Sequence, residues 1–73
     1  MLNNLQLKIS KEILTLSRKL KVSNDEEKNN IFNVISLMKF AFELANDEDS
    51  VSRANQIFQN SKLIQSNKEK TDG

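Results

Sequence analysis

The side chains in this sequence that are grouped closely enough for acid–base chemistry are two clusters of carboxylates, at residues 25–27 and 47–49. Two acids in different environments can divide the roles of general acid and general base. Each cluster, however, stands where a helix is expected to begin, and neither has an aromatic or apolar pocket pattern beside it. Acids at that position stabilise a helix through its dipole. We therefore interpret both clusters as structural rather than catalytic.

Other kinds of active site lack the residues that they need. The chain has no cysteine and no histidine, which excludes thiolate nucleophiles, disulfides, thiolate metal sites and the commonest general base. Its one glycine is Gly73, so a glycine-rich phosphate loop cannot be formed, and the acids lack the D-x-D-x-D-G pattern of a calcium loop. We expect a protein that is not an enzyme and that holds no cofactor and no metal.

The net charge of +1 conceals an uneven distribution along the chain. Residues 1–24 carry five basic and one acidic side chain (+4), residues 25–49 carry two and seven (−5), and residues 50–73 carry four and two (+2). None of these segments is a dense block of one sign. Such asymmetry more often orients neighbouring helices or subunits than it marks a nucleic-acid surface.

The spacing of apolar residues predicts two helices in the first two thirds of the chain. A helix near residues 2–21 and a second one from the turn at residues 22–24 to about Ala45 would each gather apolar residues on one face. Ser23 and Glu26 are expected to form the capping box that starts the second helix. The two apolar faces consist of Leu2, Leu5, Ile9, Ile13, Leu16 and Leu20, and of Ile31, Val34, Ile35, Met38, Ala41, Phe42 and Ala45.

A third helix is predicted from about Ser50 to Gln65, capped by Asp47, Asp49 or Ser50. Its apolar side consists of Val51, Ala54, Ile57, Phe58, Ser61 and Ile64. The expected fold class is therefore all-α, a small three-helix bundle formed by a helical hairpin and a third helix. Residues 1–65 would form the single domain, and residues 66–73 a disordered polar tail.

The three helices carry more apolar surface than one small bundle hides. The second helix has a further ridge about 120° from its main face, and the first and third helices have leucines outside their apolar stripes. A middle helix needs apolar surface toward two neighbours, so an intrachain core explains part of this surplus. Large exposed apolar patches usually mark association surfaces. The candidate association surface comprises Leu7, Leu14, Leu37, Phe40, Leu44 and Leu63.

These observations favour a protein partner over other partners. We expect a small regulator, adaptor or inhibitor that associates with itself, through its second helix with help from Leu7 and Leu14, or with a larger protein. The alternative is a nucleic-acid-binding regulator that uses a basic surface on the first helix. That surface comprises Lys8, Lys11, Arg18 and Lys19, and the chain has no Trp or Tyr to stack on bases. No stretch of about 20 apolar residues suits a membrane, and no secretory signal is evident, so a cytoplasmic location is expected.

Truncation after Gln65 is expected to leave the melting temperature unchanged. Residues 66–73 contain no apolar side chain, and ordering each residue costs roughly 1–2 kcal/mol of backbone entropy. Thermal unfolding of the truncated and full chains measures this. A lower melting temperature after truncation would show that these residues pack on the bundle.

Overall fold

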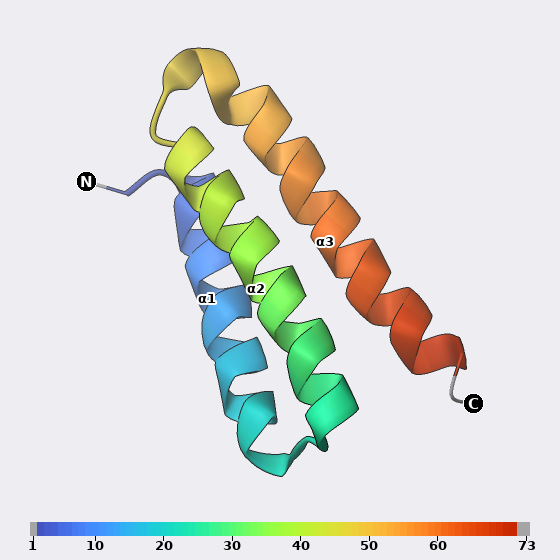
Figure 1. The fold of residues 1–73 in the computed structure, drawn as a ribbon. Helices are drawn as coiled ribbons and strands as arrows, with labels where there is room; N and C mark the ends of the chain where they lie inside the picture. Colours follow the sequence, from blue (N-terminus) through green and yellow to red (C-terminus); the bar gives the residue numbers. More distant parts are fainter. Residues whose placement is uncertain (1, 72–73) are drawn as a thin grey trace.

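The computed structural model describes residues 2–71, and side chains up to residue 65. Its helices are α1 (Asn4–Lys19), α2 (Asp25–Leu44) and α3 (Val51–Thr71), joined by 3₁₀ turns at Leu20–Val22 and Glu48–Ser50. The described part of the chain contains no strand. The predicted all-α three-helix architecture is confirmed (Figure 1).

Helix α2 occupies the middle of the bundle. Both α1 and α3 pack along it, whereas α1 and α3 contact each other at only a few positions. The core follows from this arrangement, because the broad apolar face of α2 meets one apolar stripe from each neighbour. Its buried hydrophobic residues are Ile9, Leu16, Ile31, Val34, Ile35, Met38, Ala41, Ala45, Ala54 and Phe58.

Small side chains bring α2 and α3 together near their connection. Ala41, Ala45 and Ala54 are all buried there, so the two backbones meet with little between them. Further along α3, the larger ring of Phe58 fills the interface, and the Lys62 ammonium lies 5.4 Å from the centre of that ring. In Figure 1, α3 accordingly leans away from α2 toward its C-terminal end.

Polar contacts fix the start of α1 against the end of α2. Asn3 and Gln6 form a capping box, in which the Gln6 amide donates to Asn3 Oδ1 at 2.8 Å and the Asn3 amide donates to Gln6 Oε1 at 3.1 Å. The same two side chains donate to the Ala45 and Phe42 carbonyls, at 2.8 and 3.3 Å. The last carbonyls of a helix have no partner within it, so this pair satisfies two of them while it orients α1.

The connection between α1 and α2 differs by one residue from the predicted cap. Asn24, not Ser23, is the N-cap: its Oδ1 accepts from the Glu27 amide at 2.9 Å, and its Nδ2 donates to Glu27 Oε1 at 3.3 Å. The Ser23 hydroxyl instead donates to the Lys19 carbonyl at 2.7 Å, near the end of α1. The predicted pairing of Ser23 with Glu26 was therefore wrong, because Ser23 completes the preceding helix.

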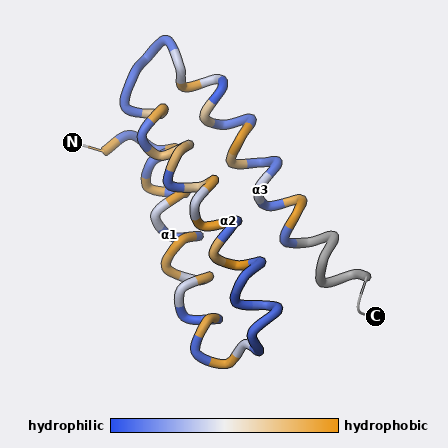
Figure 2. The backbone as a smooth tube through the Cα atoms, in the orientation of Figure 1, coloured by the Kyte–Doolittle hydropathy of each residue, from blue (hydrophilic) through white to orange (hydrophobic). Residues whose placement is uncertain are grey.

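The connection between α2 and α3 is hydrophilic, whereas the helices on either side alternate between hydrophilic and hydrophobic stretches (Figure 2). Asp47 caps its 3₁₀ turn by accepting from the Asp49 amide at 3.2 Å and from the Ser50 hydroxyl at 3.4 Å. Helix α3 then continues to Thr71, beyond the end predicted near Gln65. Side chains from residue 66 onward and all of residues 72–73 lie outside the described residues, so the disordered tail stays a prediction.

Two apolar residues predicted to face the core are exposed. Leu2 precedes the first residue of α1, and Ile64 lies about 120° around α3 from Phe58, on a flank of the helix rather than toward α2. Phe42 is partly buried and packs against the core. The stripes were thus correct for most positions and wrong before the start of α1 and in the second half of α3.

Replacing Met38 with alanine is expected to destabilise the bundle by about 2–5 kcal/mol. Met38 is fully buried on α2, so its removal leaves a cavity where all three helices contribute to the core. The midpoint of urea denaturation measures the change. Leu14→Ala is the control, since Leu14 is half exposed and its truncation should shift the midpoint little.

Candidate association surface

More of the large hydrophobic side chains in the described part of the chain are exposed than are fully buried. Among the described residues, nine are exposed, while the buried core holds ten hydrophobic residues, three of which are alanines. The nine are Leu2, Leu7, Leu14, Val22, Phe32, Leu37, Phe40, Leu63 and Ile64. Whether these residues can form a binding surface depends on which of them lie side by side in the fold.

The second ridge of α2, formed by Leu37, Phe40 and Leu44, lies on the flank turned away from α1. Phe42 marks the opposite flank of α2, the one that faces α1, because it lines a small pocket together with Ser10 and Ile13 of α1. At about 100° per residue, the three ridge residues lie about 140–160° around α2 from Phe42. Leu37 and Phe40 are exposed, and Leu44 packs partly against the core.

Two isoleucines of α3 lie on the same side of the molecule. Val51 and Asn55 line a groove with residues of α1 and therefore mark the flank of α3 that faces α1. Ile57 and Ile64 lie about 120–180° around α3 from those two residues. Because α2 and α3 pack against each other, their flanks away from α1 form one continuous face.

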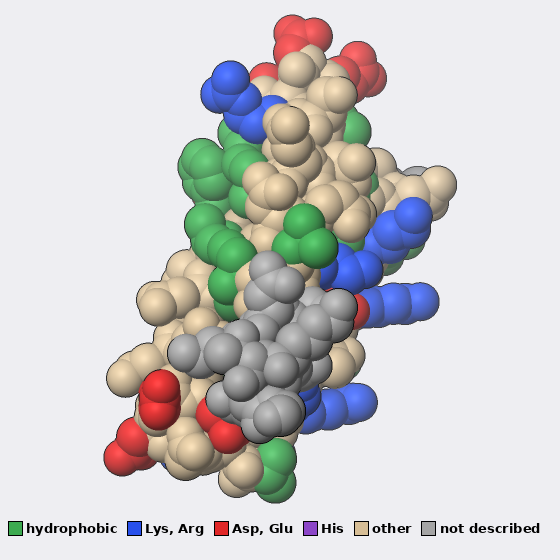
Figure 3. Space-filling view, turned by 90° about the vertical axis from the view of Figure 1, so that its right-hand side faces the viewer, with side chains coloured by type: hydrophobic (Ala, Val, Ile, Leu, Met, Phe, Trp, Pro, Cys, Tyr) green, Lys and Arg blue, Asp and Glu red, His purple; other side chains and the backbone are tan. Residues whose placement is uncertain are grey.

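We name this surface the α2–α3 face and define it by Leu37, Phe40, Leu44, Ile57 and Ile64. By helical geometry, Asn33 and Asn60 are polar neighbours of this face. Arg53 is a charged neighbour, near the C-terminal end of α2. In Figure 3, where α3 is nearest the viewer, hydrophobic side chains gather on the left of the upper half, and most basic side chains project on the right. The face is apolar and poor in charge, as the centres of protein interfaces are.

The structure divides the six residues predicted as one association surface among three sides of the molecule. Leu37, Phe40 and Leu44 lie together on the α2–α3 face. Leu7 and Leu14 lie about 140–160° around α1 from the buried Ile9, on the outer side of that helix, and Leu63 lies about 140° around α3 from Phe58. Sequence reasoning missed Ile64 as an exposed residue, and it missed Phe32, which is 55% exposed beside the polar strip of Ser36, Lys39 and Glu43.

The four residues of the predicted basic surface are all exposed on α1. Lys11 and Arg18 lie opposite the buried stripe, whereas Lys8 lines the groove between α1 and α3, and Lys19 belongs to the last turn. They are therefore spread over a wide arc of the helix. No exposed aromatic residue lies among them on α1, since the helix contains none.

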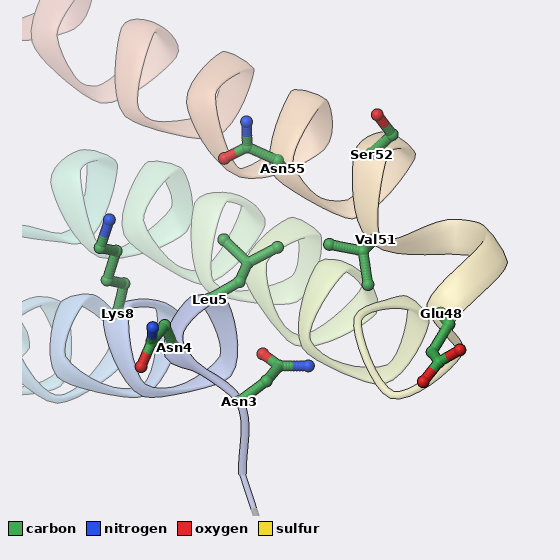
Figure 4. A pocket seen from close by; sticks show the side chains of 8 residues that line it. All are labelled: Asn3, Asn4, Leu5, Lys8, Glu48, Val51, Ser52 and Asn55. Carbon is green, nitrogen blue, oxygen red and sulfur yellow. The ribbon is translucent and has the colours of Figure 1, made fainter.

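A groove between the starts of α1 and α3 has a volume of about 850 Å³ (Figure 4). Leu5 and Val51 point toward each other across it, and the other lining side chains are polar. Asn3, at its rim, is already engaged with Gln6 and with the Ala45 carbonyl. No buried, unpartnered polar group of the described residues points into the groove, so nothing in it indicates a ligand.

Other kinds of site receive no support from the described residues. Within residues 2–65, no group of three or more acidic side chains is arranged to hold a metal ion, and none of the described helices has the length and apolar character needed to cross a membrane. The buried polar side chains of the described part are Gln6 and Ser61, both hydrogen-bonded to backbone carbonyls. The chain matches no family model, no curated protein and no solved structure.

Replacing Phe40 with glutamine is expected to change the stability of the isolated protein by less than about 0.5 kcal/mol, because its ring is 52% exposed. Phe58→Gln is the matched substitution in the core, where the ring is 2% exposed, and it should cost several kcal/mol. Urea denaturation at low protein concentration compares the two. Equal losses of stability would show that Phe40 belongs to the core and not to a free face.

Proposed function

We propose that this protein acts by associating with another protein chain, as a small regulator, adaptor or inhibitor, and that the α2–α3 face is its binding surface. The observation that carries the proposal is the continuity of that face: five apolar side chains from two helices, with a half-exposed phenylalanine near its centre. A cytoplasmic location, consistent with a chain that has no cysteine, is part of the proposal.

The physical chemistry of the face suits a helical ligand. Burial of apolar surface contributes about 25 cal/mol per Å², and an aromatic side chain near the centre of an interface often carries much of the binding energy. Two packed helices form a shallow groove between their ridges, which matches an amphipathic helix with apolar residues at spacings of three and four. The polar neighbours Asn33 and Asn60 provide hydrogen-bonding groups at its margin.

Nucleic-acid binding receives less support from the same residues. The exposed phenylalanines, Phe32 and Phe40, both belong to α2, whereas the basic residues of the alternative site belong to α1. Binding to single-stranded nucleic acid combines basic and aromatic side chains in one groove. Here the two types are on different helices, and one of the two exposed phenylalanines, Phe40, lies on a charge-poor face.

Photo-cross-linking in the native cell tests the proposal. A benzophenone side chain in place of Phe40 is expected to give a discrete adduct that protease removes and nuclease does not. The same group in place of Phe32 is the matched control, because Phe32 is equally exposed on the same helix but lies about 12 Å along it and about 80° around it from Phe40. Adduct formation at 40 without adduct at 32 supports the α2–α3 face as the binding surface.

Two results would contradict the proposal. Equal adducts from both positions would show unselective contact with exposed aromatic residues. A nuclease-sensitive adduct from the same group at Lys11, with none at position 40, would show that the basic side of α1 binds nucleic acid instead.

A further inference from the structure

The outer side of α1 carries a narrow stripe in which leucines and basic residues alternate. Leu7, Lys11, Leu14 and Arg18 lie within about 60° of one another around the helix, at spacings of four, three and four residues. Leu7 and Leu14 are exposed, and neither Lys11 nor Arg18 is buried. We name these four residues the α1 stripe. Its two leucines occupy the i and i+7 positions of a helix that binds in an apolar groove, and Lys11 stands at the intervening i+4 position.

The apolar spacing of this stripe matches that of the α2–α3 face. Leu7 and Leu14 are seven residues apart, about 10.5 Å along α1, and Leu37 and Leu44 are separated by the same distance along α2. Phe40 lies between Leu37 and Leu44 along α2, and Ile57 and Ile64 of α3 belong to the same face. Two leucines at this spacing can therefore pack on either side of the Phe40 ring.

The surroundings of the two surfaces differ in the sign of their charge, although the basic residue Arg53 lies on the α2–α3 face itself. The α2–α3 face lies between two acidic clusters, the first turn of α2 (Asp25–Glu27) and the connection at 47–49, and the segment 25–49 carries a net charge of −5. The segment 1–24, which contains the stripe, carries +4. Complementary potentials of this kind direct which surfaces meet and in what orientation. Contact between two α2–α3 faces would instead bring acidic ends together.

We propose that the α2–α3 face binds the α1 stripe of a second copy of this chain. This inference rests on the proposed function and names the partner for the same face. The two surfaces lie on different sides of one molecule, so the contact is head-to-tail, and each copy keeps one surface free after the first contact is made. One helix lying on two is expected to bury less than roughly 1,200 Å², the lower end of the range for stable interfaces, which predicts a weak and concentration-dependent association.

Sedimentation velocity of two single variants and of their mixture tests the head-to-tail contact. Leu14→Asp blocks the stripe and Phe40→Asp blocks the face, so each variant alone is expected to remain a monomer at concentrations where the wild type exceeds twice the monomer mass. Mixed in equal amounts, they should form a complex of twice the monomer mass that grows no further, because each supplies the surface that the other lacks. Circular dichroism verifies that both variants keep the helical content of the wild type.

The controls follow from the same geometry. Phe32→Asp should associate as the wild type does, since it belongs to neither surface, and raised salt should weaken association of the wild type. A Leu14→Asp variant that still dimerises, or a mixture that stays monomeric, would overturn the head-to-tail contact. A wild type that stays monomeric at high micromolar concentration would also overturn it, while a protein adduct from position 40 would still support the face as a binding surface for a different chain.

Discussion

The structure depends on α2 being the helix against which both others pack. Contact between α1 and α3 is slight, so nearly all the buried apolar surface is buried against α2. A helix with two neighbours must present apolar residues over a wide arc, and on α2 that arc extends past the core-facing Met38 to Leu37 and Phe40. None of the described helices covers that last part of the arc. The exposed α2–α3 face is thus a direct consequence of placing the most apolar helix in the middle.

Sequence periodicity was enough to predict the three helices and most of the core, because the positions that share a helix face are set by local geometry alone. Ile9, Met38 and Phe58 illustrate this. Periodicity did not predict the exposure of residues whose burial depends on how the helices are arranged relative to one another. Ile64 is exposed because it lies on a flank of α3 that α2 does not cover. Gln6 is buried because the start of α1 meets the end of α2, a contact that the sequence pattern does not predict.

The candidate site shows the same division between local and tertiary information. The ridge of Leu37, Phe40 and Leu44 was evident from spacing, since all three lie on one helix. Its continuation onto α3 through Ile57 and Ile64 was not, because the rotation of one helix relative to its neighbour cannot be derived from a helical wheel. For the same reason, Leu7 and Leu14 were grouped with the ridge in the sequence but lie on another side of the folded chain.

The near absence of contact between α1 and α3 also bears on how the chain folds. The broad helix interfaces join helices that follow one another in sequence, so each is closed by a short connection and costs little loop entropy. Domains dominated by such local contacts reach their native state in microseconds to milliseconds. Either hairpin, α1 with α2 or α2 with α3, can form first, and the remaining helix then adds to an α2 that is already in place. The same topology gives α1 and α3 separate routes of local opening, because losing one of them leaves most of the other's contacts with α2 intact.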